Sequence, residues 1–494
     1  MVIYYGYQMF HNKPWYDELY TYYSFISRGP VYAAIHWPVP NNHVFYSVLS
    51  AFLDYFGNSF IGLRGISYVA SLCNMILLYK VANKIMSKIF SAICVLIYIS
   101  TYLVNSLSIQ GRGYTLATTC YLIVILCLYH ICCEKEKKRY YIIYAIALTA
   151  GLYTLVSSTF WVIPICMTGG LYLLINKEYK KLIKLILYSL LAAAMTFFLY
   201  TLIWLAIGSN LLSKDATSAY YGIYQVKIIL RDPIQAFLTG VNYMLSTPYV
   251  QSIGRTQVIQ ELFFYLTSLF GLFYNGKGTF IVVLLGIGSI FSFFIVLKYN
   301  ASQKSCCFMN LFIMVSILLM PLMLIIQSVQ PYKRVFSYFA VPYGLLISFF
   351  MYYFLNKLSS DKFKSIFAYP IICIIGIFSF TLLFSDYYTA QYADRENKVF
   401  EILSEADVSS IQKMYYTDDY QKYIFKFYYD LEPEEVELKD SDYILVSKEV
   451  LKPSYEQPVW PVFMAYGGLD MEYIGSNFSE IGENDMYFLY QRKE

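Results

Sequence analysis

Residues 114–139 read YTLATTCYLIVILCLYHICC, followed directly by EKEKKR. The first 20 of these residues are apolar enough and long enough to cross a hydrocarbon core of about 30 Å as one helix. The six residues that follow carry four cations, and an excess of Lys and Arg is typical of loops on the cytoplasmic side of a membrane. This stretch therefore predicts a transmembrane helix that begins outside and ends at the cytoplasmic face.

The same pattern recurs along the chain, in which 58% of the 494 residues are hydrophobic and 14% are charged. Soluble domains carry about 25% charged residues, so the composition excludes an ordinary soluble protein. We expect an α-helical polytopic membrane protein with about 10 or 11 spans. Ten apolar runs are candidate spans: 60–79, 89–108, 114–133, 140–156, 159–176, 183–207, 279–297, 307–327, 336–355 and 365–385.

The linkers between these runs differ in charge. Five of them total 38 residues and hold 16 Lys and Arg, whereas five others total 138 residues and hold 10. The basic set comprises 80–88, 134–139, 177–184, 298–304 and 357–364. The other set comprises 11–59, 109–113, 156–160, 208–278 and 328–335. The positive-inside rule places the basic set in the cytoplasm, and every span then alternates in direction.

Net charge divides the chain into two modules. Residues 1–385 hold 27 Lys and Arg against 10 Asp and Glu, a net charge of +17, whereas residues 386–494 hold 10 against 23, a net charge of −13. This asymmetry predicts a transmembrane domain over 1–385 and a separate C-terminal domain over 386–494. In the tail we expect helices at 397–403 and 418–429 and strands at 413–416, 442–447 and 486–490. The tail should therefore be a small α/β domain on the extracytoplasmic side.

The predicted topology requires a span before residues 11–59, yet only residues 1–10 precede them. Ten residues are too few to cross the membrane, so we expect the sequence to lack part of its first helix; a half-span held by its neighbours is the alternative. Apolar residues at helical spacing over 42–56 predict an outer juxtamembrane helix. The apolar run at 262–273 is too short to cross and predicts a second helix of that kind.

Acidic residues are rare in the membrane part, and two of them are adjacent. Asp17 and Glu18 lie among aromatic residues in the first outer segment, which should hold them at the aqueous face of the bilayer in a partly desolvated setting. A carboxylate in such a place can act as a general base. The alternative is that both simply occupy the start of a helix, where acidic residues are favoured.

Basic residues gather on the same predicted side. Each one alone could be a membrane anchor, but together they indicate a site for an anionic lipid head group, since Arg and Lys both bind phosphate. These residues are Arg64, Arg112, Arg255, Lys333 and Arg334. Neither His36 and His43, which lie in the same outer segment as Asp17, nor the ten Cys have the spacing of metal ligands. These residues therefore indicate no cofactor and no obligatory divalent metal ion, and they leave the use of a divalent metal open.

Four segments carry a resemblance to a known family. In chain order they are YDELY at 16–20, PNNHVFYSVL at 40–49, QGRGYTL at 110–116 and PYKRVFSYFAVP at 331–342. These segments resemble the outer-loop motifs of GT-C superfamily glycosyltransferases, in the family 39 branch that holds bacterial relatives of protein O-mannosyltransferases and of lipid A aminoarabinose transferases. The resemblance covers about 1–385. Gln110 stands where an acidic residue is common, and Val44 follows His43 where Pro is common; both leave the sugar and the acceptor open.

The resemblance implies a GT-C fold and inverting transfer of a hexosyl or pentosyl group from a polyprenyl-phosphate donor to a hydroxyl of a glycan, lipid or protein. It implies a multi-pass cell-envelope enzyme that acts at the outer face and binds no nucleic acid. Asp17 would be the general base, and Glu18 would orient Asp17 or the acceptor. The residues expected to hold the donor are Arg334, Arg112, Arg64, Lys333, Arg255, Tyr114 and His43. A transporter, flippase or polymerase of lipid-linked glycans, or a membrane scaffold, is the alternative.

Overall fold

The computed structural model describes residues 1–37, 41–213, 222–246, 250, 252–299, 303–357, 369–385, 394–404, 409, 411–417, 419–451 and 469–493. The chain divides into two compact units. The helical unit comprises Met1–Met9 and Phe25–Tyr388, and the sheet unit comprises Phe10–Ser24 and Thr389–Glu494. The grouping of Phe10–Ser24 with the C-terminal residues is not apparent from the sequence.

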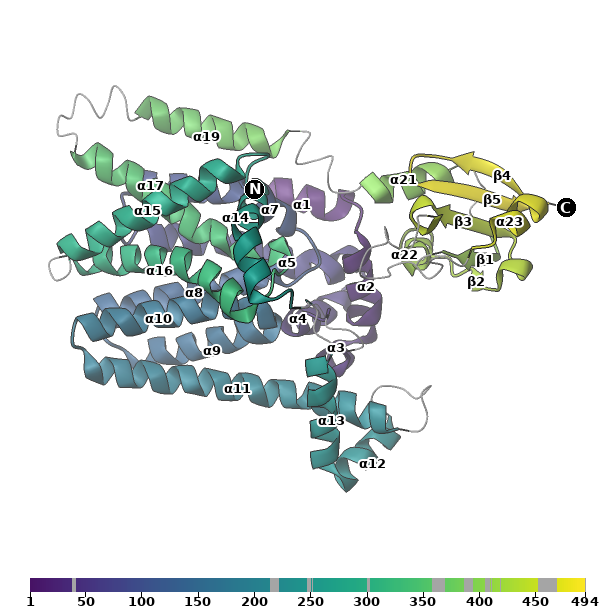
Figure 1. Ribbon diagram of the computed structural model, residues 1–494, viewed down its shortest axis with the longest axis horizontal. Coiled ribbons are helices and arrows are strands. Elements are labelled where there is room, and N and C mark those ends of the chain that lie inside the picture. The colour runs from purple at the N-terminus through teal and green to yellow at the C-terminus, as the bar shows by residue number, and fades with distance from the viewer. Residues whose placement is uncertain are drawn as a thin grey trace. The chain divides into compact units, whose positions relative to one another are not determined.

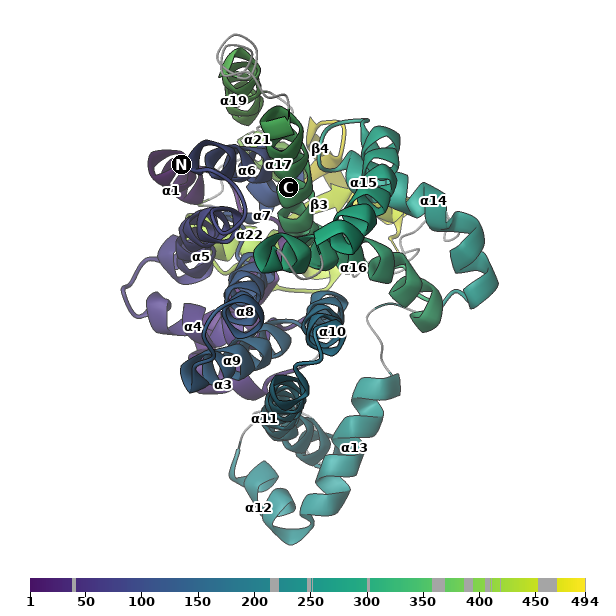
Figure 2. The ribbon, with the colours of Figure 1, turned by 90° about the vertical axis from the view of Figure 1, so that its left-hand side faces the viewer.

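The described part of the helical unit consists of helices (Figures 1 and 2). Its first half contains most of α1 (Val2–His11), then η1 (Ile26–Arg28), α3 (Pro30–Ile35), α4 (Val44–Asp54), α5 (Ser59–Ala82), α6 (Lys88–Ser100), α7 (Tyr102–Leu107), α8 (Tyr114–Cys133), α9 (Lys138–Thr154) and η2 (Val156–Ser158). Its second half contains α10 (Thr159–Ile175), α11 (Tyr179–Leu212), α12 (Ile223–Arg231), α13 (Pro233–Ser246), α14 (Arg255–Gly271), α15 (Gly278–Tyr299), α16 (Lys304–Gln327), η3 (Lys333–Phe339), α17 (Ala340–Lys357) and α19 (Tyr369–Leu383).

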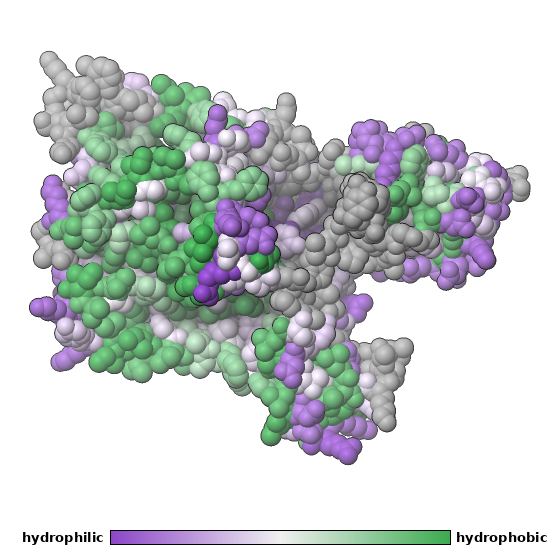
Figure 3. Space-filling model, in the orientation of Figure 1, coloured by the Kyte–Doolittle hydropathy of each residue, from purple (hydrophilic) through white to green (hydrophobic). Residues whose placement is uncertain are grey.

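Among the described residues, seven helical segments are long and apolar enough to cross a membrane: α5, α8, η2 with α10, α11, α15, α16 and η3 with α17. Apolar side chains cover much of the surface that these helices present in Figure 3. The predicted runs at 140–156 and 365–385 correspond to α9 and to the shorter α19. The predicted helical membrane architecture is thereby confirmed. Pro40 and the basic residues at 358–364 lie outside the described residues.

The predicted run at 89–108 forms two helices instead of one continuous span. Helix α6 ends at Ser100, Thr101 is extended, and α7 begins at Tyr102. The backbone N–H of Tyr102 donates to the carbonyl of Phe273 at 2.9 Å, and that of Leu103 to the carbonyl of Leu272 at 3.1 Å. Carbonyl groups just beyond α14 thus satisfy the first N–H groups of α7, which permits the break in the middle of an apolar run.

Helix α8 is packed into the interior of the bundle against α5, α9, α10 and α16. Helices α11 and α13 approach each other closely at two glycines. A Cβ atom on Gly208 would lie 1.7 Å from the carbonyl oxygen of Ala236, and one on Gly240 would lie 1.9 Å from that of Trp204. Only glycine permits this backbone approach, as in other tightly packed membrane helices.

The sheet unit is the small α/β domain that the sequence predicts. Its elements are α2 (Tyr16–Ser24), α21 (Asp394–Leu403), β1 (Lys413–Tyr416), α22 (Asp419–Ile424), the π-helical turn η6 (Phe425–Tyr429), β2 (Glu434–Glu435), η7 (Leu438–Asp440), β3 (Tyr443–Ser447), η8 (Lys448–Leu451), α23 (Met471–Asn477), β4 (Phe478–Glu483) and β5 (Tyr487–Arg492). The strand order is β2-β1-β3-β5-β4. Strands β2, β1 and β3 are parallel, and β5 is antiparallel to both β3 and β4.

Candidate functional site

The predicted carboxylate pair lies in the first turn of α2. Glu18 is buried, with 1% of its surface exposed, and its Oε2 accepts a hydrogen bond from the backbone N–H of Trp15 at 3.3 Å. That contact is half of a capping box, which satisfies an otherwise unpaired N–H at a helix start. Asp17 is half-buried, and its backbone carbonyl accepts a hydrogen bond from the Thr21 hydroxyl at 2.7 Å.

Aromatic side chains hold α2 within the sheet unit. Tyr23 stacks on Tyr423 with ring centroids 5.4 Å apart, and Tyr16 lies 6.1 Å from the same ring. Leu19 is fully buried in the core that α2 shares with the sheet. The segment that carries Asp17 is therefore anchored to α22 by contacts between residues about 400 positions apart in the chain.

In the helical unit, three of the predicted donor-binding residues meet where α8 begins. The backbone N–H of Gly113 donates to Nδ1 of His43 at 2.8 Å. The guanidinium Nη2 of Arg112 donates to Oδ1 of Asn41 and lies 3.1 Å from Nε2 of His43. The ring of Tyr114 meets the His43 ring edge-on, with centroids 5.0 Å apart.

The turn that carries Arg112 is fixed on α5. The hydroxyl of Ser67 donates to the carbonyl of Gln110 at 2.6 Å, and that of Ser71 donates to the carbonyl of Ser108 at 2.8 Å. Arg112 itself is buried, with 1% of its surface exposed. Burying a guanidinium is costly unless it is paired, and Arg112 is paired with Asn41. The start of α8 also favours a negative charge, so an anion beside Arg112 would be stabilised by both.

The contacts of His43 determine which ring nitrogen carries its proton. Because Nδ1 accepts a hydrogen bond from Gly113, the neutral ring carries its hydrogen on Nε2. This N–H faces the Arg112 guanidinium, which has donors only. An acceptor oxygen placed beside both groups would receive a hydrogen bond from each, so the pair is suited to an anionic oxygen.

Arg334 acts on the same histidine. Burial lowers the pKa of His43 well below its usual value, and the charges of Arg112 and Arg334 lower it further. Arg334 is half-buried, and its guanidinium lies 5.2 Å from the centroid of the Tyr332 ring. We call His43, Arg112 and Tyr114, which are in contact, together with Arg334, whose charge acts on His43, the cationic cluster.

The other predicted basic residues have different surroundings. Arg64 is fully buried, and its Nη1 donates to the carbonyl of Met9 at 3.0 Å, which joins α5 to α1. The Nζ of Lys333 donates to the hydroxyl of Ser268 on α14. Arg255 is exposed at the first residue of α14. Lys333 adjoins Arg334 in η3, whereas these contacts do not link Arg64 or Arg255 to the cationic cluster.

Sequence reasoning missed two groups that shape the cationic cluster, Asn41 and Gly113. Asn41 and Asn42 precede His43 directly, and the Asn42 amide donates to the carbonyl groups of Ala33 and His36 at 2.8 and 3.0 Å. The paired asparagines were visible in the sequence, but their partners depend on the tertiary fold. Among the residues that the structure describes, no group of three or more His, Cys, Asp or Glu side chains could hold a metal ion.

Replacing Gly113 by Ala should disturb the cluster without changing its charge. The new Cβ would lie 2.6 Å from Thr154 Cγ2 and 3.2 Å from His43 Cβ, so the histidine would have to shift. A misplacement of about 1 Å at a reacting site costs about 10²-fold in rate. We expect a loss of that order in a transferase assay. Gly271→Ala is the matched control, since its Cβ would meet nothing within 4 Å; equal losses in both variants would contradict the prediction.

The lowered pKa of His43 predicts how stability depends on pH. The folded protein prefers the neutral ring, whereas the unfolded chain takes up a proton as the pH falls through about 6.5. Below that pH the unfolded state binds more protons than the folded state. The stability that the neutral His43 contributes is therefore present above about pH 6.5 and is lost as the pH falls below it. When the pH is lowered from about 7.5 to about 5.5, the melting temperature of the His43→Gln variant should decline less steeply than that of the wild-type protein. Identical slopes in the two proteins would show that His43 does not contribute.

Comparison with known proteins supports the resemblance that the sequence predicts. The family model described as dolichyl-phosphate-mannose-protein mannosyltransferase matches residues 43–204, which include His43, Arg112 and Tyr114. Comparison with the curated proteins gives no match.

Solved structures with a similar chain trace include the Archaeoglobus fulgidus oligosaccharyltransferase in complex with Zn and sulfate, with 16% identity and a TM-score of 0.44 over 77% of this chain and 49% of that one. Another is the archaeal oligosaccharyltransferase AglB of the same organism in complex with an inhibitory peptide and a dolichol-phosphate. It has 14% sequence identity and a TM-score of 0.43, over 77% of this chain and 52% of that one. This chain thus spans about half the length of these enzymes. The family match over residues 43–204 confirms the predicted resemblance to the protein O-mannosyltransferase branch of the GT-C glycosyltransferases.

Proposed function

We propose that this protein is a multi-pass membrane glycosyltransferase that moves a sugar from a polyprenyl-phosphate donor to an acceptor hydroxyl on the extracytoplasmic face. The observation that carries the proposal is the cationic cluster, in which Nη2 of the buried Arg112 lies 3.1 Å from Nε2 of His43. A phosphate oxygen placed beside both nitrogens would accept a hydrogen bond from each, and it would gain charge as the sugar leaves.

An apolar groove in the helical unit supports a lipid-linked donor. Its volume is about 550 Å³, and it lies among α14, α15 and α16. Residues on its wall include Leu266, Phe270, Leu285, Phe293, Met314 and Phe339. Phe339 on this wall is the last residue of η3, the short helix that begins with Lys333 and Arg334. A prenyl chain in this groove would therefore begin close to the basic residues of η3.

The chemistry needs a base but no acid. The acceptor hydroxyl gives its proton to Asp17 as its oxygen bonds to the anomeric carbon, and the bond from that carbon to the phosphate oxygen breaks. Polyprenyl phosphate leaves with the bonding electron pair, and the added negative charge is stabilised by Arg334, Arg112 and Lys333. Attack from the face opposite the phosphate inverts the anomeric configuration. Glu18, which caps the start of α2, orients Asp17.

The acidic C-terminal residues gain a role in this proposal. The sheet unit holds α2 through Tyr423 and the buried Leu19, so it fixes the segment that carries the general base. Its place on the extracytoplasmic side follows from the charge pattern of the linkers.

The test is direct. The purified protein is incubated with a polyprenyl-phosphate-linked hexose or pentose and an acceptor, and released polyprenyl phosphate is measured. A transferase produces polyprenyl phosphate and glycosylated acceptor in equal amounts. If the protein instead carried the intact lipid-linked sugar across vesicles without cleaving it, the transporter alternative would replace this proposal.

A further inference from the structure

A second pocket lies at the opposite end of the helical unit from the cationic cluster. It has a volume of about 600 Å³ and lies among α5, α8 and α9. Residues on its polar side are Tyr79, Lys80, Asn83, Lys84, His130 and Tyr140. Helix α8 begins at Tyr114, and at 1.5 Å per residue His130 lies roughly 24 Å further along its axis. The predicted donor site does not use this pocket.

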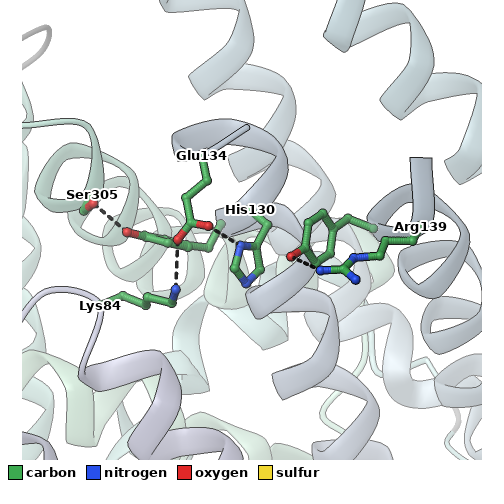
Figure 4. Close-up of polar contacts among 7 residues, drawn as sticks. Lys84, His130, Glu134, Arg139 and Ser305 are labelled. Carbon is green, nitrogen blue, oxygen red and sulfur yellow. Dashed lines mark hydrogen bonds and ion pairs between the residues drawn. The ribbon is translucent and has the colours of Figure 1, made fainter. Parts of the chain in front are cut away.

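An ion-pair network fixes the basic groups at one side of the pocket (Figure 4). The Nζ of Lys84 lies 2.8 Å from Oε1 of Glu134, and Nδ1 of His130 lies 2.6 Å from Oε2 of the same carboxylate. In the figure both side chains point toward Glu134. Glu134 thus holds the side chains of Lys84 and His130, both of which line the pocket.

Aromatic rings make the wall rigid. The His130 ring stacks on Tyr140 with centroids 4.3 Å apart and planes 5° apart. The Nη2 of Arg139 donates to the Tyr140 hydroxyl at 3.1 Å, and its guanidinium lies 4.9 Å from the centre of that ring. The ring of Tyr129 lies 5.0 Å from Nζ of Lys84, and its hydroxyl is 2.7 Å from that of Ser305.

Two donors on the pocket wall are not used by this network. Within the described part of the chain, the side chains of Lys80 and Asn83 make no hydrogen bond or ion pair with another residue. Lys80 lies one turn before Lys84 at the end of α5. An ammonium and an amide at this spacing can both donate to phosphate oxygens.

The apolar lining of the pocket lies on the side toward the middle of the bundle. Leu77 precedes Lys80 on α5, Leu126 precedes His130 on α8, and Ile143 follows Tyr140 on α9, which runs in the opposite direction. Ile143 is 42% exposed, and its neighbour Ile146 on the same helix is 53% exposed, so the pocket adjoins the apolar outer face of the bundle. A free anion would leave this apolar wall unused, whereas an amphiphile would cover it.

We propose that this pocket binds an anionic glycerophospholipid, whose phosphate accepts hydrogen bonds from Lys80, Asn83 and Lys84 and whose acyl chain packs against Leu126 and Ile143. The lipid comes from the leaflet at this end of the bundle, which the linker charges predict to be the cytoplasmic leaflet. Such a lipid would join the ends of α5, α8 and α9.

The test uses the full chain, purified in detergent and exposed to equal amounts of phosphatidylglycerol and phosphatidylcholine. Native mass spectrometry then counts the lipids that stay bound. We expect the wild-type protein to retain more phosphatidylglycerol than phosphatidylcholine. In the double variant Lys80→Gln, Asn83→Ala this preference should fall about fivefold, which is the effect of removing one cation near a lipid phosphate. The matched control is Lys135→Gln, Lys137→Gln, which removes two cations from the α8–α9 linker outside the pocket lining.

A second variant tests the apolar half without changing charge. Ile143→Trp should fill the pocket and lower phosphatidylglycerol retention, and its partly exposed position makes the larger side chain tolerable. Inorganic phosphate at millimolar concentration should not displace the lipid, since it leaves the apolar wall uncovered. The proposal fails if the wild-type protein retains both lipids equally, if phosphate displaces the lipid, or if the control loses as much preference as the pocket variants.

Discussion

Asp17→Asn is expected to lower the turnover number of sugar transfer by about 10²- to 10⁴-fold, the usual contribution of a general base. The amide has nearly the same shape as the carboxylate but cannot accept the acceptor proton. Asp17 is half-buried in the first turn of α2, and its backbone carbonyl, which the substitution keeps, accepts the hydrogen bond from Thr21. The substitution should therefore leave the helix intact and leave the KM for the donor nearly unchanged.

Asp232→Asn is the matched control for this prediction. Asp232 is an exposed acidic residue of the helical unit, and its carboxylate caps α13 by accepting the N–H of Gln235 at 3.0 Å, which an amide oxygen can also do. A purified Asp17→Asn protein with wild-type turnover would remove Asp17 from the mechanism. Tyr423→Ala extends the test, because loss of the ring stacked on Tyr23 should loosen α2 and lower turnover by a smaller factor.

The membrane helices were predictable because their signal is local. An apolar run of 20 residues bounded by EKEKKR has few alternatives, and α8 occupies residues 114–133 as expected. In the sheet unit, β1 and β3 follow from short apolar and aromatic runs. Strand β4 was missed because FSEIGE is largely polar and carries a register shift between Glu480 and Gly482, which breaks the alternation on which strand prediction depends.

The candidate site was predictable only as a set of residue types. The charge pattern selected Arg112 and Arg334, and the family resemblance added His43, which Arg112 contacts and on which the charge of Arg334 acts. The tautomer of His43 could not be predicted from the sequence, because it depends on a hydrogen bond from the backbone N–H of Gly113, which lies 70 residues further along the chain. The anchoring of α2 on α22 was equally hidden, because stacking between Tyr23 and Tyr423 leaves no pattern in the sequence. Tertiary contacts between distant residues, rather than local propensity, decide both features.

Arg334→Gln is expected to lower the turnover number by about 10²- to 10³-fold, as the loss of one charge-stabilising donor does in other enzymes. Arg334 is half-buried, whereas Arg112 is almost fully buried, so the Arg334 variant should fold. Arg231→Gln is the matched control, since Arg231 is exposed at the last residue of α12.

The kinetic pattern distinguishes Arg334 from Asp17. A phosphate ligand contacts the donor in the ground state and more strongly as charge develops, so Arg334→Gln should raise the KM for the donor as well as lower turnover, whereas Asp17→Asn should lower turnover alone. Arg334→Lys keeps the charge but loses the two-pronged geometry, so its activity should lie between those of Gln and wild type. If Arg334→Lys were no more active than Arg334→Gln, the positive charge of Arg334 would not be what supports turnover. If Arg334→Gln changed neither constant, the phosphate would be held by Arg112 and Lys333 without it.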